Sequence, residues 1–257
     1  MNLRDQPSDE IVARDVCVIV VGAGKGERFG GGENKIFAKI DDQPLFLKAL
    51  QLFCNREDVC QTILVVSPED MGQVREKYGP NLGFMGVKLV EGGAQRHDSV
   101  RNGLAAVSDD AKYVAVHDAV RVCVADPWID EIFLAARSVD GLLPVTPVTS
   151  TLKRIGKDGA IEETVSRAGL YMAQTPQVFR REVLIDAYAK LGDEDAATIT
   201  DDAQVAALAG CTVGTIDGDN RNIKITTKDD LALAKAIIRS LPQKQITSRG
   251  VFDEAQW

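Results

Sequence analysis

The sequence predicts an α/β fold, a Rossmann-like, doubly wound and mostly parallel sheet from which a β-hairpin arm projects. Short β-branched runs recur along the chain, and segments of helical periodicity separate most of them. This alternation stops once, between Pro147 and Gln177. Strands that alternate with helices are typical of a parallel sheet covered by helices on both faces, and the interruption indicates an insertion.

The first expected strand is the run Val16-Cys17-Val18-Ile19-Val20-Val21, which Gly22 ends. A continuous β-branched run is typical of a strand buried on both faces, so we expect it near the centre of the sheet. Further strands are expected at 62–66, 87–90, 113–116, 142–145 and 212–216. Helices are expected at 44–54, where a proline suits the first turn, and at 99–107, 127–139, 180–191, 201–209 and 228–240.

The arm is expected over residues 147–177. Within it, residues 149–155 and 161–165 flank Asp158-Gly159, a dipeptide that favours the tight turn of a hairpin. Helical patterns resume after residue 180, so the arm is an insertion and not a domain boundary. We therefore expect a single domain over 16–240, preceded by a flexible segment over 1–15 and followed by a polar tail over 241–257.

Composition excludes several classes of protein. The 257 residues are 45% hydrophobic and 26% charged, which is typical of a globular chain. Thirty basic against 38 acidic side chains give a net charge of -8, which argues against a nucleic-acid partner and requires a local basic cluster for any anionic substrate. No run of about 18 apolar residues predicts a membrane span, and residues 1–15 lack the apolar core of a secretory signal. Five cysteines without a CxxC pair favour reduced thiols and a cytoplasmic location.

A glycine-rich loop follows the first strand directly, as Gly22-Ala23-Gly24-Lys25-Gly26-Glu27-Arg28. Glycines let backbone N–H groups approach an anion, so the loop could hold a phosphate. Glu27 excludes the GxGxxG dinucleotide motif, and no GK[ST] follows. Arg28 and Lys35 would bring permanent cations to a triphosphate, although a solvated basic loop without a ligand remains the alternative.

Several motifs in this order resemble the methylerythritol phosphate cytidylyltransferase family. They are the loop Gly22 to Lys35, Gly92-Gly93-Ala94-Gln95-Arg96-His97-Asp98-Ser99-Val100, His117-Asp118-Ala119-Val120-Arg121, Thr151-Leu152-Lys153, Arg167, Gln174-Thr175-Pro176-Gln177, Thr200-Asp201-Asp202 and Asn222-Ile223-Lys224-Ile225-Thr226. The resemblance covers roughly Val16 to Ile238. It implies a nucleotidyltransferase that joins CTP to a sugar-alcohol phosphate, 2-C-methyl-D-erythritol 4-phosphate, and releases pyrophosphate in isoprenoid precursor biosynthesis by the non-mevalonate pathway.

The resemblance also implies roles for individual residues. Arg28, Lys35 and Lys224 would be catalytic, stabilising charge on the α-phosphate and on the departing pyrophosphate. The residues implied to bind the nucleotide are Gly22, Ala23, Gly24, Gly26, Gly93, Ser99 and Asp118. Those implied to bind the acceptor are Asp118, Arg121, Thr151, Arg167, Thr175 and Thr200. A divalent cation, Mg²⁺, would bridge the phosphates with mostly water ligands, and its protein ligands stay unspecified. The arm would form a homodimer in which Arg167 and Thr175 serve the neighbouring subunit's site.

Elementary chemistry is consistent with this reaction. Nucleotidyl transfer needs neutralised charge and in-line positioning, and an anionic phosphate oxygen needs no general base. Asp118 ends a predicted strand, at the place where open α/β sheets bind ligands. Among the remaining polar residues, we expect His117 to be buried and hydrogen-bonded and His97 to lie on the surface. Asp201-Asp202 is expected in the first turn of a helix capped by Thr200, in preference to a metal site.

The chain departs from the family pattern at a few positions. Asn34 and Ile36 flank Lys35 where proline and glutamine are usual, so the loop could be less rigid; Val120, Val122 and Ser150 also differ from the usual alanine, proline and aspartate. The form His-Asp-Ala-Val-Arg also occurs in ribitol-5-phosphate cytidylyltransferases, which remain an alternative. A non-catalytic nucleotide-binding regulator is a second one, against which the presence of Arg28, Lys35 and Lys224 together argues.

Overall fold

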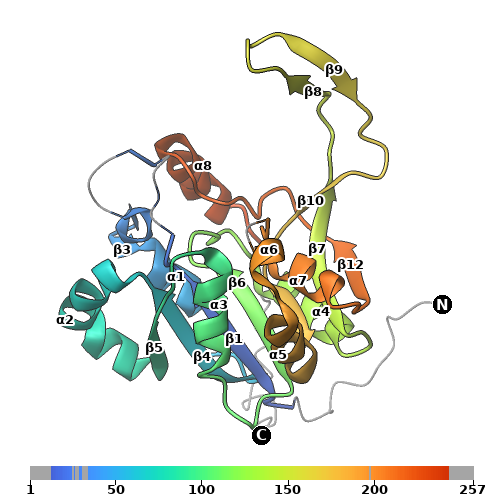
Figure 1. Cartoon of the computed structure of the whole chain (residues 1–257). Coiled ribbons are helices and arrows are strands. Elements are labelled where there is room, and N and C mark those ends of the chain that lie inside the picture. Colours follow the sequence, from blue (N-terminus) through green and yellow to red (C-terminus); the bar gives the residue numbers. More distant parts are fainter. Residues whose placement is uncertain (1–12, 25, 27–28, 31–33, 197, 243–257) are drawn as a thin grey trace, which may run out of the picture.

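The computed structural model describes residues 13–24, 26, 29–30, 34–196 and 198–242. Its described part is built on an eight-stranded mixed sheet (Figure 1). Along the sheet the strands follow the order β10-β7-β11-β6-β1-β4-β5, and β12 also pairs with β7. They are β1 Val16–Val21, β4 Val59–Val66, β5 Val87–Glu91, β6 Tyr113–Asp118, β7 Gly141–Pro147, β10 Tyr171–Ala173, β11 Gln177–Arg180 and β12 Val213–Asp217.

Strand β1 lies between β4 and β6 and is parallel to both, with Val18 opposite Thr62 on one side and Ala115 on the other. Its residues 16–20 are almost wholly inaccessible to solvent. The expected central strand is therefore confirmed. Its carboxyl end is where the glycine-rich loop begins.

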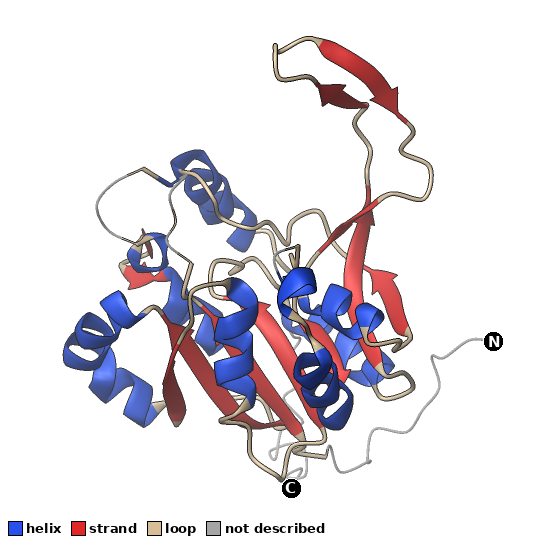
Figure 2. Cartoon of the chain, in the orientation of Figure 1, coloured by secondary structure: helices blue, strands red, loops and turns tan. Residues whose placement is uncertain are grey.

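Helices cover both faces of the sheet, as Figure 2 shows. On one face Val16, Val18 and Val20 join a core that includes side chains of α1 Leu45–Gln51, α2 Pro68–Phe84, α4 Asp126–Ala136 and α8 Lys228–Ile238. On the other face Cys17 and Ile19 pack with α3 Arg96–Leu104, α5 Arg181–Lys190 and α7 Asp202–Leu208. The doubly wound α/β architecture is thus confirmed. Smaller elements are η2 Lys35–Phe37, β2 Lys39–Ile40, β3 Gln43–Pro44 and α6 Asp193–Ala196.

The arm is a two-stranded hairpin of β8 Leu152–Ile155 and β9 Ile161–Val165, which are antiparallel. Gly159 has a φ of 84° in the turn between them, a conformation that glycine adopts without strain. Figure 1 shows the hairpin standing away from the sheet, connected to it through β7 and β10. The predicted hairpin is confirmed, although the returning chain rejoins the sheet earlier than expected, at β10.

Helix α2 and strand β11 are among the elements that were not predicted. Helix α2 contains Gly72, Gly79 and Pro80 and has few apolar side chains, so its sequence carries a weak helical pattern. Ser67 nevertheless caps it by accepting a hydrogen bond from the Asp70 backbone N–H. Strand β11 has only four residues, yet it enters the sheet antiparallel between β6 and β7. Such a short strand leaves almost no periodicity to recognise.

The predicted flexible segment 1–15 is wrong at its carboxyl end. Asp15 is buried and accepts two hydrogen bonds from the Arg137 guanidinium, at 3.1 and 2.9 Å. Residues 1–12 and 243–257, which hold the rest of that segment and most of the predicted tail, lie outside the described residues. In the described part of the chain, no helix combines the length and the apolar character needed to cross a membrane.

Candidate active site

A cavity of about 920 Å³ lies at the carboxyl ends of β1, β4 and β5. This is the edge at which open parallel sheets bind ligands, and the volume suits a nucleotide. The predicted residues in its wall are Ala23, Gly24, Gly26, Lys35, Gly93 and Ser99; the others are Val21, Ser67, Pro68, Glu69, Gly92, Ala94, Gln95, Arg96 and Thr226.

Glycines let the walls of this cavity approach each other. A Cβ atom added to Gly92 would lie 2.6 Å from the Ala23 Cβ and 2.8 Å from the Ser99 Oγ, so no larger residue fits there. Gly26 has a positive φ of 66° and turns the loop back toward Lys35. Gly22, by contrast, donates its N–H to the Val65 carbonyl at 2.7 Å. Its backbone therefore extends the sheet, and its N–H group is not available to a nucleotide.

The Asp118 carboxylate lies close to three cationic side chains near the large cavity. It lies 3.0 Å from the Lys224 Nζ, 3.2 Å from the Arg121 Nε and 3.8 Å from an Arg96 nitrogen. Burial raises the pKa of Asp118, but the charges of these three residues lower the pKa by more, to well below its usual value. An ionised carboxylate thus holds Lys224, Arg121 and Arg96 together at the end of β6.

A smaller cavity of about 80 Å³ opens beside this carboxylate. Lys35, Gly24, Arg96 and Val21 line both this cavity and the large one. The smaller one is also lined by Gly22, Asp118, Lys224, Ile36 and Val120. The structure therefore brings the predicted catalytic Lys35 to the boundary between the two spaces and the predicted catalytic Lys224 into the wall of the smaller one.

Arg96 is a site residue to which the sequence assigned no role. Its guanidinium pairs with Asp202 at 2.8 Å, and Asp202 is fully buried and also accepts a hydrogen bond of 2.6 Å from the Tyr188 hydroxyl. The Arg96 Nη1 atom has no hydrogen-bond partner among the described residues. The sequence motif that contains Arg96 was recognised. Only the fold shows that a carboxylate of α7 anchors this arginine, because Asp202 lies 106 residues further along the chain.

His117 and Thr175 lie behind the Asp118 carboxylate. His117 is fully buried, and its ring nitrogens bond the Arg121 carbonyl oxygen at 2.8 Å and the Thr175 hydroxyl at 3.1 Å. The predicted buried, hydrogen-bonded position of His117 is confirmed, and burial lowers its pKa to about 4, so the imidazole is neutral. The Thr175 hydroxyl also accepts from the Asp118 backbone N–H at 3.2 Å. Thr175 therefore supports the Asp118 segment of its own chain, and its role in a neighbouring subunit's site stays a prediction.

Other polar residues take positions that differ in detail from the predictions. The Ser99 hydroxyl accepts from the Gly93 N–H and donates to the Gln95 carbonyl, inside a helix whose cap is Gln95. The hydroxyl thus donates one hydrogen bond and accepts one within the protein, and the side chain lines the large cavity. His97 is buried and not at the surface, since helix α3 begins at Arg96 and turns its imidazole inward.

Helix α7 begins one residue later than predicted. Asp201 is its cap and accepts from the Gln204 N–H at 2.9 Å, whereas the exposed Thr200 donates to the Gln204 side chain. The capping role predicted for Thr200 is therefore wrong. Asp202 is in the first turn, as predicted.

The structure does not bring three of the predicted acceptor residues to the cavities. Thr151 and Arg167 are exposed and flank the two strands of the projecting hairpin, and Thr200 is exposed beside α7. None of them lines either cavity. Arg28 lies outside the described residues, so its predicted catalytic role stays a prediction.

The described residues include no group of three or more His, Cys, Asp or Glu side chains that could hold a metal ion. Asp118 is a carboxylate in the wall of the smaller cavity, and its oxygens already face cations. This donor set suits only an ion that keeps most of its ligands on phosphate and water, as Mg²⁺ does.

A protein-family model described as 2-C-methyl-D-erythritol 4-phosphate cytidylyltransferase matches residues 16–240. The enzyme of that name from Rhodopirellula baltica is 38% identical over 237 residues, which cover 88% of this chain and 96% of the relative. A bifunctional enzyme IspD/IspF from Rhodopseudomonas palustris is 35% identical over 230 residues, 89% of this chain and 57% of the relative. The chain thus spans little more than half the length of such bifunctional relatives.

Solved structures agree with these sequence relationships. The crystal structure of 2-C-methyl-D-erythritol 4-phosphate cytidylyltransferase from Thermus thermophilus superimposes with a TM-score of 0.71 at 28% identity, covering 86% of this chain and 98% of that one. A 4-diphosphocytidyl-2C-methyl-D-erythritol synthase gives a TM-score of 0.72 at 29% identity. The chain therefore belongs to the 2-C-methyl-D-erythritol 4-phosphate cytidylyltransferase family.

Proposed function

We propose that the chain transfers the cytidylyl group of CTP to the phosphate of 2-C-methyl-D-erythritol 4-phosphate and releases pyrophosphate, a step of isoprenoid precursor biosynthesis. The observation that carries this proposal is the ionised Asp118 holding Lys224, Arg121 and Arg96 beside a nucleotide-sized cavity. Clustered cations next to a cavity at strand ends suit the transfer of a phosphoryl-linked group.

In this reaction the large cavity takes CTP, and the acceptor phosphate lies near Asp118, Arg121 and Lys224. A phosphate oxygen of the acceptor attacks the α-phosphorus of CTP, and the bond from that phosphorus to the bridging β-phosphate oxygen breaks. The bonding electrons leave with pyrophosphate, and no proton has to be removed from the attacking oxygen. Lys35 and Lys224, with Arg28, would neutralise the charge that develops on the α-phosphate and on pyrophosphate.

We include Mg²⁺ as the cofactor of this reaction. Phosphate oxygens and waters would supply most of its ligands, with Asp118 as a carboxylate placed near them. The bound ion would neutralise phosphate charge and orient the triphosphate.

Homodimer formation through the arm is part of the proposal. Ile155, Ile161, Tyr171 and Met172 are each at least half exposed on or next to the hairpin. Apolar side chains and sheet edges on a projecting element favour burial against a second subunit. Thr151 and Arg167, which lie far from the cavities of their own chain, would then reach the neighbour's acceptor site.

A cytoplasmic location is also proposed. All five cysteines are free, which suits a reducing compartment.

The proposal is tested by measuring pyrophosphate release while one component at a time is omitted. We expect release only when CTP, Mg²⁺ and methylerythritol phosphate are all present, and little release with ATP, GTP or UTP. Release without an acceptor would indicate a pyrophosphohydrolase. Binding of CTP without any release would favour the non-catalytic regulator.

A further inference from the structure

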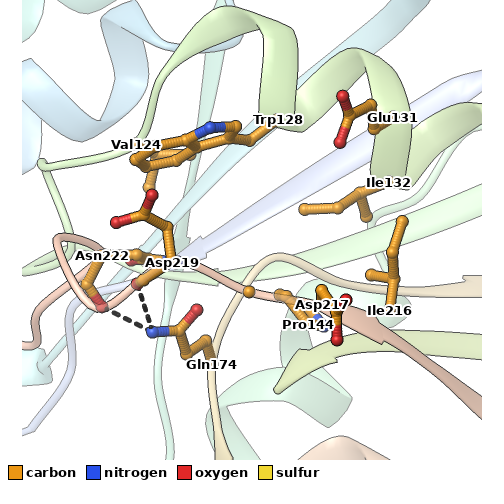
Figure 3. A pocket seen from close by; sticks show the side chains of 11 residues that line it. Val124, Trp128, Glu131, Ile132, Pro144, Gln174, Ile216, Asp217, Asp219 and Asn222 are labelled. Atoms are coloured by element: carbon orange, nitrogen blue, oxygen red, sulfur yellow. Dashed lines mark hydrogen bonds between the residues drawn. The ribbon is translucent and has the colours of Figure 1, made fainter. Parts of the chain in front are cut away.

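Gln174 and Gln177 flank Thr175-Pro176, and each is almost wholly buried. The Gln174 side chain donates from Nε2 to the carbonyl oxygens of Asp219 at 2.8 Å and Asn222 at 3.3 Å. Figure 3 shows both bonds, which join the segment after β10 to the loop after β12. Because two carbonyl oxygens face this nitrogen, the position requires a donor group with two hydrogens, which the side-chain amide supplies.

The loop that Gln174 holds carries Lys224. The Asn222 carbonyl also accepts from Arg121 at 2.7 Å, and its amide donates to the Thr175 carbonyl at 2.9 Å. Gly218 opens the same loop, and a Cβ atom there would collide with the Gln174 side-chain oxygen. The loop is therefore closed against Gln174 just before it reaches Lys224, whose Nζ lies 3.0 Å from Asp118.

A cavity of about 130 Å³ adjoins this loop beside Gln174 and separates Asp219 and Asn222 from Ile132 of α4 (Figure 3). A void provides no contacts to restrain the chain. Further along the loop, Arg221 stacks on Trp128 and Ile225 packs in the core. The hydrogen bonds of Gln174 therefore hold the stretch of the loop that faces the cavity.

Gln177 acts on a different element. Its oxygen accepts from the N–H groups of Asp202 at 3.1 Å and Ala203 at 3.0 Å, and its nitrogen donates to the Asp201 carboxylate at 3.0 Å. It thus satisfies free donors in the first turn of α7. That turn carries Asp202, the carboxylate that anchors Arg96.

We propose that Gln174 and Gln177 are positioning residues for the two cations on either side of Asp118. Gln174 works as a donor and positions Lys224, whereas Gln177 works mainly as an acceptor and positions Arg96 through Asp202. The proposal rests on the transfer reaction proposed above. It matters for rate because a displacement of about 1 Å in a charged group can cost roughly a hundredfold.

The test uses the full chain with the substitutions Gln174→Met, Gln177→Met and Gln61→Met. Gln61 is a matched control: its side chain also joins backbone groups, donating to the Ala106 carbonyl at 3.0 Å and accepting from Ser108 at 2.7 Å. It lies near the start of β4, away from the cavities. Gln174→Glu, and Gln177→Glu combined with Asp201→Asn, separate the donor role from the acceptor role.

Hydrogen exchange read by mass spectrometry gives the first readout. We expect Gln174→Met to raise exchange over residues 218–226 and Gln177→Met over 201–208, with neither region affected in Gln61→Met. Equal increases in both regions for either glutamine would overturn the assignment. This readout needs no turnover, so it stays decisive if the wild-type chain shows no transfer activity and the proposed function fails.

Turnover gives the second readout. We expect kcat to fall by about tenfold or more in Gln174→Met and Gln177→Met, and to stay within about twofold of wild type in Gln61→Met. Gln177→Glu combined with Asp201→Asn should recover most of the rate, because the acceptor oxygen stays and the new asparagine amide donates to the glutamate; Gln177→Glu alone would set two carboxylates against each other. Gln174→Glu should not recover the rate, because it lacks the donor. If kcat in both Met variants equals kcat in Gln61→Met, the two glutamines have only a structural role and the proposal is overturned. If a Met variant does not fold, the Glu variant at that position decides the result.

Discussion

Asp118 organises the site through its charge. It is buried, ionised and surrounded by Lys224, Arg121 and Arg96, so its negative charge lets three cations stay close together. Their combined positive field is available to phosphate groups in the adjoining cavities. This chemistry needs no Ser-His-Asp constellation. His117 precedes Asp118 in the sequence, and its ring holds the local structure in place by hydrogen bonds to the Arg121 carbonyl and the Thr175 hydroxyl.

Lys35 is expected to act on the transition state more than on nucleotide binding. It lines both cavities, so its ammonium can follow the charge that moves toward pyrophosphate. Lys35→Ala should lower kcat by about a hundredfold while weakening CTP binding much less, by analogy with the loss of a preorganised donor. Lys35→Arg should recover only part of the rate, because a planar guanidinium does not replace a compact charge. Steady-state kinetics and calorimetry decide this, and a loss explained wholly by weaker binding would contradict it.

His117 should make stability depend on pH. Burial lowers its folded-state pKa from 6.5 to about 4, so below pH 6.5 the unfolded chain takes up a proton that the folded chain does not. The free energy of unfolding should therefore fall as the pH drops from about 6.5 to 4, by up to about 3 kcal/mol from this residue. Urea titrations across this range check the slope. His117→Asn should flatten it, and an unchanged slope in that variant would refute the assignment.

At the scale of elements, the predictable parts are those with strong local patterns. The β-branched run of β1 and the Asp158-Gly159 turn both have physical causes that are local in sequence. Helix α2 and strand β11 lacked such patterns, because the first is mostly polar and the second is very short. The anchoring of Arg96 by Asp202 depends on α3 and α7 lying together, which no local pattern encodes.

Asn34 illustrates a departure that the fold accommodates. The sequence suggested a less rigid loop where proline is usual. In the structure the Asn34 side chain accepts from the Ile36 N–H at 3.3 Å and donates to Asp70 of α2 at 2.7 Å. Two hydrogen bonds thus constrain the chain immediately before Lys35, in place of the proline ring.

The hairpin arm should be dispensable for folding and essential for turnover. Its strands pair with each other and stand clear of the sheet, so replacing residues 151–167 with a short flexible linker removes little buried surface. We expect the variant to fold as a monomer with a cooperative thermal transition, CTP binding to persist and turnover to fall by at least about a hundredfold. Thermal melts, calorimetry and pyrophosphate release measure these three quantities. A loss of CTP binding would show that the arm supports the nucleotide cavity instead.

At the scale of the whole molecule, arm exchange predicts that two inactive variants complement each other. Arg167→Ala would damage the partner's site, and Lys35→Ala would damage its own. After mixing and subunit exchange, half of the dimers contain one of each, and in these dimers one site carries both defects while the other is intact. Because a two-fold symmetric dimer has two sites, a quarter of all sites are intact, and we expect about a quarter of wild-type activity to return. Light scattering confirms the mass of the species, and a fully active monomer without complementation would contradict the dimer.

The most direct test of the central claim is a competition between the two acceptors in one reaction. The chain is given CTP, Mg²⁺ and equal concentrations of methylerythritol phosphate and ribitol 5-phosphate, and mass spectrometry quantifies the two cytidine diphosphate products at early times. The ratio of products reports the ratio of kcat/KM values directly. We predict that 4-diphosphocytidyl-2-C-methyl-D-erythritol dominates by about a hundredfold or more. Equal amounts of both products, or an excess of the ribitol product, would contradict the proposed acceptor.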